Sequence, residues 1–142
     1  MQAIPGMETP DSLPSGTVTP LELTKFSEEH AIPVPVYTDG VDQAIVIWNL
    51  LPGQENESHM HPFSAHTFLI MEGEGLYVKG EPGTAECEEF PVKAGQVILI
   101  PREQVHGIKN TGTGKMSYFA VTTTAGGEYK RIINGEEVMP HG

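Results

Sequence analysis

The chain has 142 residues, a length that suits one domain of ordinary size and leaves no room for two. Its 8 basic and 19 acidic residues give a formal net charge of -11, so we exclude nucleic acid and anionic membranes as partners. No apolar run approaches transmembrane length, no signal-peptide pattern begins the chain, and a single cysteine, Cys87, permits no internal disulfide, so we expect a cytoplasmic protein.

The N-terminal segment, residues 1–20, carries four prolines and is interpreted as an extended arm without regular structure. Apolar and polar residues alternate over residues 21–26, which predicts a first strand. Ser27 is then placed to cap a single helical turn. Pro33 and Pro35 exclude a helix and favour an edge strand.

The segments that follow are short and rich in β-forming residues, and glycine, proline or asparagine separates them. In chain order the predicted strands are 43–51, 58–63, 67–71, 76–79, 85–90, 96–100, 105–109, 116–124 and 129–133. Many short strands without a helix longer than one turn predict an all-β sandwich or barrel. We expect this barrel domain to span residues 21–135 and a tail to follow over 136–142.

Four of the six histidines fall in two neighbouring hairpin regions. His59 and His61 lie two apart on a predicted strand, so both side chains point to one face. His66 follows after a short bend, and His106 begins a strand of the second hairpin. Neutral imidazole is the commonest metal ligand in proteins. A pair spaced like His59 and His61 can bind one ion where other strands supply the remaining ligands, as the interior of a barrel does.

The spacing of these residues resembles the two sequence motifs of the cupin family. The first motif is glycine, five residues, His-x-His, three or four residues, glutamate, six residues and glycine, and it matches Gly53, His59, His61, position 66 and Gly73. The second is glycine, five residues, Pro-x-Gly, two residues, histidine, three residues and asparagine, and it matches Gly95, Pro101, His106 and Asn110. The resemblance implies a double-stranded β-helix, or jelly-roll barrel, in two antiparallel sheets.

Two positions depart from the motifs. Glu103 stands where the second motif has glycine, and we expect this change to affect only the local backbone of a turn. His66 stands where the first motif has glutamate, so a divalent ion would keep its full charge and act as a stronger Lewis acid. The resemblance therefore implies one divalent transition metal ion (Fe, Mn, Ni, Zn or Cu) bound by His59, His61, His66 and His106.

Three functions are consistent with such a site. The metal acts as a Lewis acid on a small oxygen-rich substrate, an enolisable carbonyl or a carboxylate, in cyclase, isomerase or lyase chemistry similar to that of polyketide-cyclase-type cupins. Alternatively, the protein is an O2-dependent cupin dioxygenase, although a bidentate substrate plus O2 needs more open positions than four histidines leave on an octahedral ion. The third possibility is a small-molecule or metal-binding cupin without catalysis.

Residues around the motifs complete the prediction. Glu57 shares strand parity with His59 and is the candidate general base, and the alternative is a solvent-facing carboxylate on an acidic surface. Phe68 and Ile70 share parity with His66, so we expect them to line the cavity. Because cupins commonly dimerise through N-terminal strands, the arm and residues 21–26 predict a homodimer.

Overall fold

A computed structural model describes residues 16–38, 41–123, 131–133 and 136–138 of the chain. Its elements in chain order are the 3-10 helix η1 (Pro20–Leu23) and the strands β1 (Ile32–Thr38), β2 (Gln43–Leu50), β3 (Glu55–His59), β4 (His66–Glu72), β5 (Glu74–Lys79), β6 (Glu88–Lys93), β7 (Val97–Ile100), β8 (His106–Lys109), β9 (Met116–Thr123), β10 (Arg131–Ile133) and β11 (Glu136–Val138).

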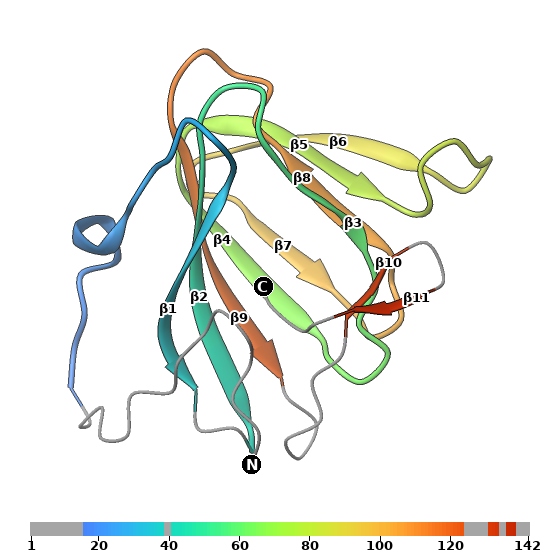
Figure 1. Ribbon diagram of the computed structural model, residues 1–142, viewed down its shortest axis with the longest axis horizontal. Coiled ribbons are helices and arrows are strands. Elements are labelled where there is room, and N and C mark those ends of the chain that lie inside the picture. The colour runs from blue at the N-terminus through green and yellow to red at the C-terminus, as the bar shows by residue number, and fades with distance from the viewer. Residues whose placement is uncertain (1–15, 39–40, 124–130, 134–135, 139–142) are drawn as a thin grey trace.

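Two antiparallel sheets make up most of the fold (Figure 1). One has five strands in the order β1-β2-β9-β4-β7, and the other has four in the order β3-β8-β5-β6. The expected all-β class with two antiparallel sheets is thus confirmed. Within the described ranges no helix is longer than η1, and none could cross a membrane.

The start of the barrel differs from the prediction, because residues 21–26 do not form a strand. Pro20 instead begins η1, where its fixed φ and missing N–H suit the first helical position. Leu21 and Leu23 are 53% and 37% exposed, so their alternation with polar residues marks no buried sheet face. Ser27 accepts a hydrogen bond from the Glu29 N–H, but a bend rather than a helical turn follows.

The structure also bears on the predicted C-terminal end of the barrel domain, residue 135. Strands β10 and β11 pair with each other, with Arg131 opposite Val138. We expected the barrel to end at residue 135, yet the strand that follows, β11, pairs with β10. The domain limits stay predictions, because residues 1–15 and 139–142 lie outside the described residues.

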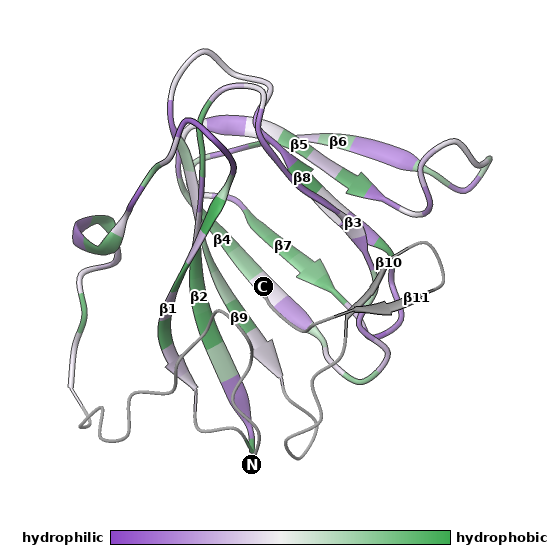
Figure 2. Ribbon diagram, viewed as in Figure 1, coloured by the Kyte–Doolittle hydropathy of each residue, from purple (hydrophilic) through white to green (hydrophobic). Residues whose placement is uncertain are grey.

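The core between the sheets follows from the alternation of each strand. Apolar residues concentrate on β2, β4, β7 and β9 (Figure 2). On β4, Phe68 and Ile70 are buried while Leu69 between them is 41% exposed. The Tyr118 ring of β9 lies 4.8 Å from Phe68 and 6.4 Å from Trp48, and its hydroxyl accepts a hydrogen bond of 3.0 Å from Asn56 of the other sheet. The three rings pack side by side within the five-stranded sheet, and the Asn56 hydrogen bond joins this sheet to the other.

The motif residues other than histidine have structural roles. Gly53, Gly73 and Gly95 have φ values of +86°, +81° and +93°, in a region that L side chains adopt only at a cost. Asn110 is buried, and its side-chain amide donates to the carbonyls of Leu50 and Gly114 at 2.8 and 2.9 Å. These hydrogen bonds give Asn110 a structural role.

Candidate metal centre

The four motif histidines lie at strand ends in the interior, between the sheets. His59 ends β3 and lies opposite His106, the first residue of the neighbouring β8. His61 follows β3 in a loop, and His66 begins β4 of the facing sheet. All four are buried, with exposed fractions of 1% for three of them and 4% for His66.

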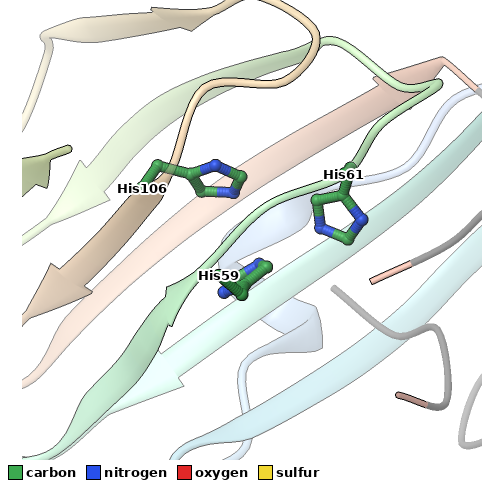
Figure 3. Close-up of side chains that lie close together, drawn as sticks. All are labelled: His59, His61 and His106. Atoms are coloured by element: carbon green, nitrogen blue, oxygen red, sulfur yellow. The ribbon is translucent and has the colours of Figure 1, made fainter. Parts of the chain in front are cut away.

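Three of these histidines form a compact cluster. The rings of His59, His61 and His106 turn toward one another (Figure 3), and their donor nitrogens all lie within 4.8 Å of one another. Ring centroids of His59 lie 4.8 Å from His61 and 4.5 Å from His106. Metal–nitrogen bonds are about 2.0–2.1 Å long, so two nitrogens on one ion lie at most roughly 4.2 Å apart. Small side-chain movements would bring the cluster to this spacing.

Backbone carbonyls orient two of the rings. The Nδ1 atom of His59 hydrogen-bonds to the Glu57 carbonyl, and that of His106 to the Gln104 carbonyl at 2.9 Å. A carbonyl only accepts, so each Nδ1 carries the proton and each Nε2 keeps its lone pair. Metal-binding histidines usually bind the ion with one ring nitrogen and donate the N–H of the other nitrogen to a carbonyl or carboxylate, as the Nδ1 atoms do here. The donor set therefore fits a divalent transition metal ion.

His66 lies beside the cluster, with its ring centroid 4.5 Å from His61 and 4.7 Å from His106. Its Nδ1 contacts the Thr122 hydroxyl at 2.9 Å, and its buried Nε2 has no hydrogen-bond partner among the residues that the structure describes. Burial, and next the nearby His106 and His61, hold the pKa of His66 well below its usual value. The ring is therefore neutral at pH 7, the form that binds metals. Its role as a fourth ligand stays a prediction.

Glu57 does not have the environment that strand parity predicted. The β3–β8 register shifts between Asn56 and His59, so parity does not carry from His59 back to Glu57. The Glu57 side chain is exposed, and its backbone carbonyl is the group that contacts His59. The proposed role of Glu57 as a general base stays a prediction, without support from this geometry.

Phe68 and Ile70 are buried on the interior side of β4, and the prediction that they line a ligand cavity stays a prediction. The Phe68 ring lies 5.7 Å from His66 and 6.0 Å from His106, so it forms an apolar wall beside the histidines. Ile70 lies further along β4 and belongs to the hydrophobic core.

Glu103 and Thr122 contribute to the site in ways that the sequence did not reveal. Glu103 has a φ of +68° where the motif has glycine, and its N–H donates to the His61 carbonyl at 3.0 Å. The Glu103 turn thus also holds the backbone of His61 in place. Thr122, the partner of His66, is 56 residues away in sequence, and the only available signal was its interior position in the alternation of β9.

Comparisons with known proteins agree with this geometry. A family model described as "Cupin domain" matches residues 46–122, just over half of the chain. Auxin-binding protein 1 from Arabidopsis thaliana is 29% identical over 102 residues, which cover 68% of this chain and 50% of that protein. An uncharacterized protein from Methanocaldococcus jannaschii is 34% identical over 73 residues, which cover 51% of this chain and 54% of that one. The chain thus spans about half the length of these curated relatives.

The solved structures show the same fold. An uncharacterized protein with a double-stranded β-helix domain from Klebsiella pneumoniae superposes with a TM-score of 0.71 and 25% identity, over 91% of this chain and 100% of that one. The expected double-stranded β-helix is therefore confirmed.

Proposed function

As the chain belongs to the cupin family, we propose that it is a metal-dependent enzyme that acts on a small oxygen-rich substrate, an enolisable carbonyl compound or a carboxylate. The observation that supports this is the buried cluster of His59, His61 and His106, with His66 beside it. A divalent ion held there would supply Lewis acidity to a substrate oxygen, as in cyclase, isomerase or lyase chemistry.

The chain's own residues prepare the site for this role. The Glu57 and Gln104 carbonyls fix the orientation of two imidazoles, and low pKa keeps the His66 ring neutral. Phe68 excludes water from one side of the cluster, which strengthens electrostatic interactions with a bound substrate. We propose that all four histidines bind the ion.

Two alternatives remain distinct from this proposal. The first is O2-dependent dioxygenase chemistry at the same histidines. The second is binding of a small molecule or metal without catalysis, which is favoured by the similarity to a relative named as a binding protein. Metal identity and turnover separate the three.

Elemental analysis by mass spectrometry tests the proposal on protein purified without added metal or a histidine tag. We expect about one equivalent of a transition metal per chain. Zinc or nickel would support Lewis-acid chemistry, to be followed by assays with enolisable substrates. Iron, copper or manganese would favour the dioxygenase alternative and call for oxygen-uptake assays. Folded protein that stays empty when metal is offered would contradict the site.

We also propose that the protein is a homodimer, through the outer face of the five-stranded sheet. On this face Leu69 of β4 lies opposite Val97 of β7, and Leu99 follows, with exposed fractions of 41%, 52% and 73%. Leu21 of η1 lies beside Leu69 across a shallow groove. A contiguous exposed apolar patch is typical of an interface.

We expect a cytoplasmic location as well, where the free thiol of Cys87 would stay reduced.

Leu99→Asp is expected to convert this dimer to a monomer, because it places a charge at the most exposed residue of the apolar patch. Light scattering after size-exclusion chromatography measures the mass of each species. Val41→Asp is the matched control, since Val41 is 54% exposed and lies outside the patch. A Leu99→Asp variant that remains dimeric, or a monomeric wild type, would contradict the proposed interface.

A further inference from the structure

β6 is an edge strand of one sheet and β7 an edge strand of the other (Figure 1). A groove of about 400 Å³ is lined by residues of both strands. The four-stranded sheet contributes Tyr77 and Lys79 from β5 and Phe90 and Val92 from β6. Val97, Ile98 and Leu99 of β7 line the groove from the other sheet, so the groove borders the proposed dimer face. The groove therefore combines apolar walls with one ammonium group.

The groove adjoins the candidate metal centre through His106. Lys79 lies directly opposite His106 in the β5–β8 register. Residues opposite each other on antiparallel strands extend to the same face, with Cβ atoms about 4.5–5.5 Å apart. Gln104, whose carbonyl accepts the His106 Nδ1 proton, also lines the groove. His106 itself does not line the groove, but Lys79 and Gln104 connect the lining of the groove to the histidine cluster.

Lys79 has no carboxylate within ion-pair distance in the part of the chain that the structure describes. Its other register partner, Glu88 on β6, is exposed and forms no ion pair with it. Lys79 is half-buried, and an ammonium group without a counter-ion favours a ligand that supplies the negative charge. In a chain with a formal net charge of -11, this is a local exception to the acidic surface.

The rest of the groove suits an apolar, planar body. The rings of Tyr77 and Phe90 stack with centroids 5.9 Å apart, and Val92 and Ile98 are buried beneath the groove. Burial raises the pKa of Tyr77, so its hydroxyl is protonated at neutral pH and is able to donate a hydrogen bond. Aromatic and aliphatic walls with few polar groups are typical of small-molecule sites.

We propose that this groove binds the apolar body of an aromatic carboxylate, with Lys79 holding the carboxylate beside the histidine cluster. Lys79 is then the residue that selects anionic over neutral ligands. The inference rests on the proposed function and narrows its substrate class to carboxylates with an aromatic or similarly flat apolar group.

Phenylacetate and phenylacetamide, which differ only in the charged group, test this selectivity in metal-free protein. Binding is measured by NMR titration, which suits weak ligands. We expect wild type to bind phenylacetate about tenfold more tightly than phenylacetamide, as one charge-assisted hydrogen bond provides. Lys79→Met should abolish this difference and Lys79→Arg should retain it. Lys109→Met is the matched control, since Lys109 is exposed on the outer face of the same sheet.

The titration tests ligand binding in the groove independently of whether the histidines bind a metal. Equal binding of the two ligands to wild type, or a preference that survives in Lys79→Met, would overturn it even if the histidines bind metal. Lys79→Gln replaces Lys79→Met if circular dichroism shows that the latter is unfolded. A carboxylate preference that depends on Lys79 would support the groove even if elemental analysis finds no metal and the proposed enzyme fails.

Discussion

Replacing His106 with alanine is expected to lower the affinity for zinc by at least about 100-fold, more than loss of a partner that only orients a ligand. His106 lies opposite His59, and its ring also lies close to the rings of His61 and His66. The alanine variant therefore loses the imidazole that neighbours all three other histidines. Competition with a chromophoric chelator measures the affinity of the metal-depleted protein. Zinc should also raise the melting temperature of wild type more than that of the variant.

His30→Ala is the control, because His30 is exposed and lies outside the motifs. Unchanged zinc affinity in His106→Ala would contradict a metal site at this cluster.

Two variants of His66 test whether the site has three histidine ligands or four. His66→Ala should weaken zinc binding, while His66→Glu, which restores the glutamate of the family motif, should retain it. Full affinity in folded His66→Ala would show that His66 is not a ligand.

Sequence reasoning was most successful where strand alternation was uninterrupted. On β4 it placed His66, Phe68 and Ile70 on the interior side, and all three are buried there. Strand parity did not predict that the Glu57 side chain is exposed, because the register shift in β3 is not visible in a short polar segment. The alternating residues 21–26 were misassigned because a pattern six residues long is weak evidence for a strand, and Pro20 suits the first position of a helical turn.

The parts of the site that the sequence could not reveal depend on contacts between distant segments. Lys79 reads as a polar residue before the Gly80 turn, and only the β5–β8 register places it beside His106. Similarly, Thr122 becomes the partner of His66 through the β4–β9 pairing, in which the two residues lie opposite each other. The motif spacing predicted which residues approach one another but not the groups that orient them.

The glycines of the motifs provide the second large prediction. Gly73→Ala is expected to lower the free energy of unfolding by about 3 kcal/mol or more, measured by urea denaturation. Positive φ alone costs an L side chain about 1–2 kcal/mol. A Cβ at Gly73 would also lie 2.3 Å from the Lys115 carbonyl oxygen and 2.8 Å from the Met116 Cα, so one of two backbone segments has to move. Overpacking of this kind adds roughly 1–3 kcal/mol.

Gly95→Ala separates these two contributions. Gly95 has a φ of +93°, close to the +81° of Gly73, but a Cβ there would meet nothing within 4 Å. We therefore expect Gly95→Ala to cost only the conformational term, about 1–2 kcal/mol. Equal losses in the two variants would mean that the segment around Lys115 yields freely to a Cβ at Gly73. A larger loss at Gly73 would show that this motif glycine is required both for its turn and for the close approach of β9, whose other end carries the threonine that orients His66.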